Sequence, residues 1–118
     1  MGFKSTFARI TKVNISWIRK KVKNGKYDLS AHAHLERQEE QITITEIEKV
    51  LLNGSIIEEY LNDPRGESCL VGAMIGRKAL HVVCGKRDSR LLIVTEYRPK
   101  PPTWINYKKR AKELESRG

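Results

Sequence analysis

The amino-acid sequence predicts one α+β domain, in which N-terminal helices are followed by a four-stranded antiparallel sheet and a basic C-terminal helix. Three observations point to this fold class. The chain has 118 residues, enough for a single hydrophobic core but not for two domains. Its apolar residues recur with a helical period up to residue 54 and with an extended period after it. The links between the extended runs are too short for parallel crossovers, so antiparallel hairpins are expected.

The start of the chain has the weakest pattern. Residues 1–14 alternate only slightly between polar and apolar, which fits a short strand or an ordered arm. A short helix is expected from Ser16, whose hydroxyl can cap the first backbone donors. Ile18 and Val22 lie one turn apart in it, and Gly25 offers a left-handed stop.

Two further helices are expected before residue 54. One begins at Ser30 and packs by a thin stripe. That stripe consists of Ala31, Leu35 and Gln38. The other has the clearest start signal in the sequence, because Thr43 and Glu46 have the spacing of a capping box. Ile42 and Ile47 are placed to form the hydrophobic staple across that start, and an Asn-Gly pair ends the helix.

Four runs rich in Ile, Val, Leu and Tyr predict the strands of the sheet. They are Ile56–Tyr60, Cys69–Ile75, Leu80–Cys84 and Leu91–Tyr97. Prolines at 99, 101 and 102 stop the last run, after which Thr103 can cap a terminal helix. That helix would carry Trp104, Tyr107, Ala111 and Leu114. The predicted organisation is a basic N-terminal extension (1–26), the α+β domain (27–105) and a basic C-terminal helix or tail (106–118).

The positive charge is concentrated at the two ends of the chain. Of the net charge of +9, residues 1–28 contribute +7, residues 29–68 contribute −6 and residues 69–118 contribute +8. Such a distribution is typical of a protein with one side toward a polyanion, so RNA is the expected partner. The alternative is a lysine-rich surface that contacts only solvent.

Several classes of protein are disfavoured by the sequence. No apolar run reaches the length of a signal peptide or the roughly 20 residues of a membrane span, so we expect a soluble cytoplasmic protein without membrane contact. Cys69 and Cys84 lie in apolar runs without metal-ligand spacing, which predicts buried thiols rather than a disulfide or a zinc site. A Gly-rich phosphate loop is also missing. We therefore expect no cofactor and no metal.

Four blocks of the sequence follow one another in an order and spacing that match a known family. They are SAHAHLERQEEQI (30–42), NGSIIEEYLNDPRGESCLVG (53–72), ALHVV (79–83) and LLIVTEYRPKPPTW (91–104). Over residues 27–105 they resemble the domain of unknown function numbered 4258, which is similar to the BrnT and RelE-type toxins of bacterial toxin–antitoxin pairs. The resemblance implies the RelE/BrnT-like fold and metal-independent endoribonuclease activity. It also implies a cognate antitoxin as partner, with a homodimer as a further option.

Metal-free RNA cleavage needs a base for the 2′-hydroxyl proton, an acid for the leaving oxygen and cations at the phosphate. His81 lies in the third predicted strand, on the face opposite its apolar residues, and an imidazole titrates near neutral pH. The alternative is a half-buried histidine hydrogen-bonded to Tyr97 or Thr95. Tyr97 ends the last strand beside Arg98, an arrangement that suits base stacking or a phosphate contact.

A second candidate pair lies on the helix that begins at Ser30. His32 and Glu36 are four residues apart, so the carboxylate can orient the imidazole, and the pair resembles the family's His-Ala-x-x-Glu element. The alternative is that the pair ties the helix to the sheet. His34 is expected at the surface. The predicted phosphate contacts are Arg37, Arg77, Lys86, Arg87 and Arg98.

Two non-enzymatic functions stay open beside the endoribonuclease. The same basic surface can bind nucleic acid or a ribosome without cutting it. The acidic helix over residues 43–53 can instead contact a basic protein partner, as a protein-interaction domain.

Overall fold

The computed structural model describes residues 13–101, 104–106 and 108–110. Its helices are α2 (Ile15–Lys23), α3 (Ala31–Glu39) and α4 (Ile44–Asn53). Its strands are β1 (Tyr27–Leu29), β2 (Ser55–Tyr60), β3 (Ser68–Ile75), β4 (Lys78–Arg87), β5 (Arg90–Tyr97), β6 (Trp104–Asn106) and β7 (Lys109–Arg110). The α+β class predicted from the sequence is confirmed.

The main sheet has five strands in the order β1-β5-β4-β3-β2. Strands β2 to β5 form the expected antiparallel meander, but β1 pairs parallel to β5, so the prediction of a four-stranded antiparallel sheet was wrong. Strand β1 has only three residues, too few to show a period in the sequence. The parallel pairing is possible because α3, α4 and three strands separate β1 from β5 along the chain.

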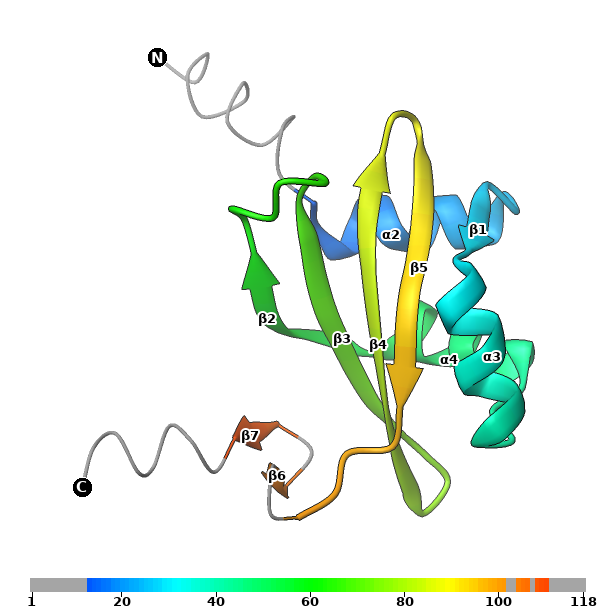
Figure 1. Cartoon of the computed structure of the whole chain (residues 1–118), viewed down its shortest axis with the longest axis vertical. Coiled ribbons are helices and arrows are strands. Elements are labelled where there is room, and N and C mark those ends of the chain that lie inside the picture. Colours follow the sequence, from blue (N-terminus) through cyan, green and yellow to red (C-terminus); the bar gives the residue numbers. More distant parts are fainter. Residues whose placement is uncertain (1–12, 102–103, 107, 111–118) are drawn as a thin grey trace, which may run out of the picture.

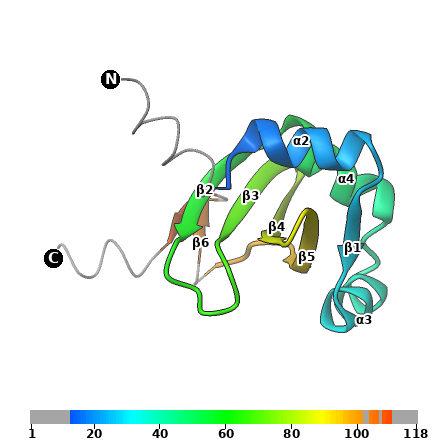
Figure 2. The same ribbon diagram turned by 90° about the horizontal axis from the view of Figure 1, so that it is seen from above.

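One face of the sheet is covered by helices. Figure 2 shows α2 and α4 together on one side of the curved sheet, and Figure 1 shows α3 beside the half of β5 that lies beyond the end of β1. The helix-covered face holds the core. Its buried residues are Val13, Ile18, Val22, Ala33, Ile42, Ile47, Val50, Leu51, Cys69, Val71, Leu80, Val82, Cys84, Leu91 and Ile93. Residues 13–26, expected to be an extension, therefore contribute to the same core as the sheet.

The helix starts follow local capping chemistry. Ser30 caps α3, and Thr43 and Glu46 form the predicted capping box of α4. The cap of α2 is Asn14, whose side chain accepts from the Trp17 amide, so the start predicted at Ser16 was two residues too late. Ser16 instead lies within the first turn of the helix and is exposed.

The packing face of α3 differs from the prediction. Its buried residue is Ala33, and Leu35 is 58% exposed. The predicted stripe of Ala31, Leu35 and Gln38 was therefore wrong, because in so polar a helix the sheet contact is set by the path of β1 rather than by hydrophobicity. The free thiols of Cys69 and Cys84 are buried, as expected.

The segment after the prolines is not helical where it is described. Strands β6 and β7 pair antiparallel in a small hairpin, so the predicted C-terminal helix was wrong over residues 104–106 and 109–110. Trp104 and its neighbour at 105 are aromatic and β-branched residues, which favour extended backbone over helix. The remaining positions of that prediction, and the predicted strand or arm over 1–12, lie outside the described residues. Among the residues described, no helix has the length and apolar character to cross a bilayer.

Candidate functional site

The face of the sheet away from α2 and α4 carries the predicted His81–Tyr97 pair. His81 and Tyr97 are partners in the register of β4 and β5, and His81 Nδ1 lies 3.3 Å from the Tyr97 hydroxyl. The two rings meet edge to face, with their centroids 5.2 Å apart. This hydrogen bond is the structural alternative to catalysis that was expected from the sequence.

The His81 imidazole is enclosed. The face of the sheet away from α2 and α4 is its open face, and His81 is 0% exposed although it lies on that face. Part of its enclosure comes from the neighbouring strand, because Gly72 is the register partner of His81 and a Cβ at residue 72 would overlap the Ile57 side chain and approach the imidazole. Substrate therefore has no direct access to this imidazole in the structure.

A β-bulge decides which side chains of β5 share a face. Ile93 pairs with Cys84 and Thr95 pairs with Val83, so Val94 is an extra residue in β5. Without the bulge, strict alternation would keep residue 97 on the same side as Ile93, in the core. The extra residue instead brings Tyr97 to the open face beside the histidine of β4.

The other predicted histidine opens onto a groove. The groove has a volume of about 310 Å³ and lies where the start of α3, the β2–β3 loop and the end of β4 approach β5. It is lined by Ser30, His32, Arg65, Arg87, Leu92 and Val94. Its floor is apolar, whereas its walls carry one imidazole and two guanidinium groups. An imidazole and two guanidinium groups that line one groove can bind a phosphate group.

His32 is positioned by the cap and first turn of α3. Ser30 accepts a hydrogen bond from the Ala33 amide and donates its hydroxyl to the carbonyl of Val94, which attaches the helix start to β5. One turn later, Glu36 Oε1 lies 3.7 Å from His32 Nε2. The imidazole is 65% exposed, so solvent weakens this ion pair but leaves the ring accessible.

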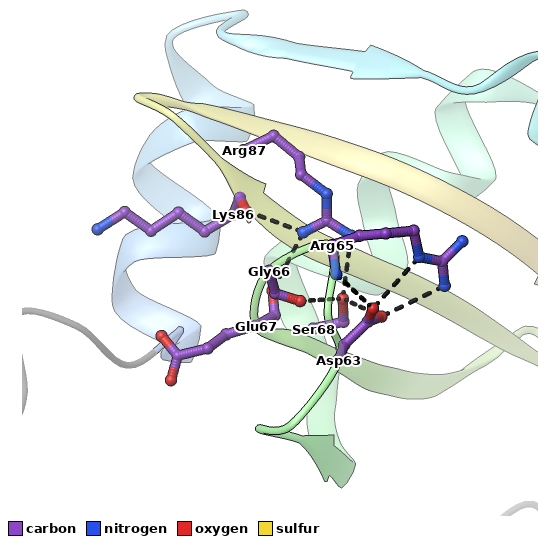
Figure 3. A network of polar contacts seen from close by, with 7 residues as sticks. All are labelled: Asp63, Arg65, Gly66, Glu67, Ser68, Lys86 and Arg87. Carbon is purple, nitrogen blue, oxygen red and sulfur yellow. Dashed lines mark hydrogen bonds and ion pairs between the residues drawn. The ribbon is translucent and has the colours of Figure 1, made fainter.

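Arg87 is held in place by backbone and side-chain acceptors (Figure 3). Its Nη1 donates to the carbonyls of Lys86, at 2.9 Å, and Glu67, at 3.4 Å, while Nη2 donates to the Ser68 hydroxyl at 3.3 Å. Gly85 makes room for this arrangement, since a Cβ there would lie 2.6 Å from Arg87 Nη1. The guanidinium is therefore fixed before any ligand arrives.

Arg65 stands on the β2–β3 loop of the same groove (Figure 3). Its Nε lies 3.2 Å from Asp63 Oδ1, which also accepts from the Arg65 amide. The hydrogen bonds from Arg65, with a further contribution from the charge of Arg87, lower the pKa of Asp63. Asp63 thus stays ionised and neutralises part of the positive charge of the loop.

The other predicted phosphate contacts do not gather at the groove. Lys86 projects to the helix side, where its Nζ lies 5.7 Å from the Trp17 ring. Arg98 lies 3.5 Å from Glu46 of α4, and Arg37 donates to the carbonyl of Ile42. Arg77 is exposed in the β3–β4 turn. Of the five predicted cations, the structure brings only Arg87 to the groove of His32.

Two features of this region were missed by the sequence analysis. Arg65 was treated only as part of a turn, although the Asp-Pro-Arg-Gly pattern signals a tight loop that fixes its direction. Glu96 was not considered, because the bulge that turns it toward the helices cannot be read from alternation. Glu96 is 0% exposed, and its burial, together with the charge of Glu36, raises its pKa to about 7.

A comparison with protein families matches residues 29–98 to the domain of unknown function DUF4258. The chain belongs to the DUF4258 family. The matched segment runs from the end of β1 to Arg98 and includes all the groove residues. No curated protein and no solved structure matches the chain. In the described part of this DUF4258 protein, no three His, Cys, Asp or Glu side chains come together as a group that could hold a metal ion.

Proposed function

We propose that this DUF4258 protein is a toxin-like endoribonuclease that cleaves RNA without a metal ion in the groove between α3 and the β2–β3 loop. The observation that carries the proposal is that His32, with Glu36 beside it, opens onto the same groove as the guanidinium groups of Arg65 and Arg87. The sequence blocks resemble the DUF4258 domain, and the similarity of that family to BrnT and RelE-type toxins supports the same activity.

The proposed reaction is transfer of a phosphoryl group within the RNA strand. His32 takes the proton of a 2′-hydroxyl, the 2′-oxygen attacks the adjacent phosphorus, and the bond to the 5′-oxygen breaks. Water at the open side of the groove protonates the leaving oxygen. Arg65 and Arg87 stabilise the charge on the phosphate oxygens in the transition state, because their guanidinium groups are already held in position. Glu36 orients the imidazole of His32.

His81 and Tyr97 have a different role in this proposal. Their rings pack against each other, and the enclosed imidazole has no path to a substrate. We therefore assign them to the packing of β4 against β5. A cognate antitoxin would inhibit the enzyme by covering the groove of His32.

Purified protein incubated with a mixed-sequence single-stranded RNA in excess EDTA tests the proposal. The variant His32→Ala is expected to lose about 100-fold or more of the cleavage rate, because a positioned acid–base group contributes that much. The matched control is His34→Ala, an exposed histidine two residues along the same helix, which should cleave like the wild type. Intact RNA after incubation with folded wild-type protein would refute the endoribonuclease.

RNA binding without cleavage is the second candidate. The observation that favours it is that the last turn of α2 carries Lys20, Lys21 and Lys23, and neither histidine pair lies on this helix. A protein of this kind would bind the same RNA in the same buffer but leave it intact, with a steep dependence of affinity on salt.

A further inference from the structure

The exposed side of α2 is a continuous basic surface. The segment from Val13 to Tyr27 contains no acidic residue and five cations. They are Arg19, Lys20, Lys21, Lys23 and Lys26. The apolar residues of the same helix face the core, where Ile18 is 0% and Val22 is 6% exposed. A helix in this orientation offers charge to a ligand but no apolar face that could enter a lipid bilayer.

An aromatic ring lies at one border of this surface. Trp17 is half-buried against the core, and two ammonium groups lie over its ring. Lys21 Nζ is 5.4 Å and Lys86 Nζ is 5.7 Å from the ring centroid. An indole beside lysines suits single-stranded nucleic acid, since a base can take the place of an ammonium group over the ring while the lysines turn to the flanking phosphates.

A groove runs along the other border of the surface. It has a volume of about 460 Å³ and is lined by Ser16, Arg19, Lys20, Lys23 and Asn24. Arg19 is anchored there, because its Nη2 donates to the carbonyl of Gly54 at 3.2 Å. Lys20 and Lys23 are exposed and can follow a phosphate backbone.

The α2 surface and the groove of His32 meet at the end of β4. Lys86 and Arg87 are consecutive residues, so their side chains leave the strand on opposite faces. Lys86 reaches the Trp17 ring on the helix side, while Arg87 lines the groove on the open side. Figure 3 shows the two side chains diverging from the strand, with α2 behind Lys86.

We propose that the α2 surface is the docking site for single-stranded RNA, with one base stacked on Trp17 and the backbone on Lys20 and Lys23. The strand then passes the end of β4 at Lys86 and Arg87 and enters the groove of His32. The docking site is inferred from the α2 surface alone, whereas the continuation of the RNA into the groove of His32 rests on the proposed function.

Fluorescence anisotropy with a labelled single-stranded RNA tests the docking site in the full chain. Loss of each phosphate contact lowers the salt slope for single strands by about 0.7, so Lys20→Ala/Lys23→Ala should lower it by about 1.4 and weaken binding about 25-fold at 0.1 M salt. The control Lys49→Ala removes an exposed lysine from α4 and should bind like the wild type. Equal affinity of the double variant and the wild type would overturn the proposal.

The stacking contact has its own readout. Tryptophan occurs twice in the chain, at residues 17 and 104, so Trp104→Phe leaves Trp17 as the only tryptophan. Single-stranded RNA should quench its fluorescence, whereas a blunt RNA duplex should bind without comparable quenching because its bases are already stacked. Trp17→Leu should weaken single-strand binding about fivefold or more, and circular dichroism shows whether that variant has folded. Unquenched Trp17 in the saturated complex contradicts stacking.

Two further outcomes separate the alternatives. Binding to vesicles of anionic phospholipid that RNA does not displace would identify a membrane ligand and overturn the RNA assignment. Cleavage by His32 variants is measured independently of binding by α2 variants. If RNA binding depends on Lys20 and Lys23 but the RNA stays intact, the endoribonuclease is refuted and the docking site is supported. If the RNA is cleaved at the same rate without Lys20 and Lys23, the docking site is refuted and the endoribonuclease is supported.

Discussion

The carboxyl group of Glu96 makes the stability of this protein depend on pH near neutrality. Glu96 is completely enclosed on the helix side of β5, and neither carboxylate oxygen has a hydrogen-bond partner among the other described residues. Burial is the largest cause of its raised pKa, and the charge of Glu36 adds to it, whereas a hydrogen bond from the backbone amide of Glu96 itself and the charge of Arg37 lower the pKa. Arg98, the first residue after β5, is turned toward Glu46 of α4.

The magnitude follows from the difference between the folded and unfolded states. Glu96 has a pKa of about 7 in the fold and an ordinary value of 4.5 in the unfolded chain. Below pH 4.5 both states are protonated, and the group has no effect. Between these two values the unfolded chain ionises first, so the free energy of unfolding falls as pH rises. About one pH unit above 7 the loss is nearly complete, and it amounts to roughly 3 kcal/mol.

Urea denaturation followed by circular dichroism at pH 5 and pH 8 measures this effect. The variant Glu96→Gln keeps the shape of the side chain but cannot ionise, so its free energy of unfolding should lack the fall of roughly 2.5 kcal/mol between pH 5 and pH 8. Glu39→Gln, at an exposed site on α3, should keep the wild-type profile. Parallel profiles for wild type and Glu96→Gln would show that the buried carboxyl group does not control the pH dependence.

Three other substitutions test the packing that supports the sites. Gly72→Ala should lower the free energy of unfolding by about 1–3 kcal/mol in urea titrations, because the added methyl group meets the side chains of the open face, including His81; wild-type stability would contradict this. Gly85→Ala should displace the guanidinium of Arg87 and lower the rate of RNA cleavage under conditions where urea unfolding shows that the variant is still folded. An unchanged cleavage rate would argue against a fixed cation. Thr43→Ala removes the capping box of α4 and should cost about 1 kcal/mol, measured by thermal unfolding; Thr43→Ser, which keeps the hydroxyl, should restore most of it.

Much of the helical half was determined by the sequence alone. The capping box of Thr43 and Glu46 and the start of a helix at Ser30 were predicted correctly, because the hydrogen bonds at each start join groups within three residues of one another. The meander from β2 to β5 was also predictable, since short links leave antiparallel pairing as the available connection. Tyr97, the hydrogen-bond partner of His81, was one of the two partners that the sequence suggested.

The candidate site itself was decided by tertiary structure. The groove combines His32 from α3 with Arg65 from a loop and Arg87 from β4, and no local pattern links residues so far apart in the chain. The parallel pairing of β1 with β5 sets where α3 begins, and the extra residue at Val94 turns Glu96 inward. The spacing of apolar residues and the capping of helices depend on residues close together in the chain, so the sequence determines the helices and strands. Which faces meet depends on register and crossovers between distant segments, and only the folded chain decides them.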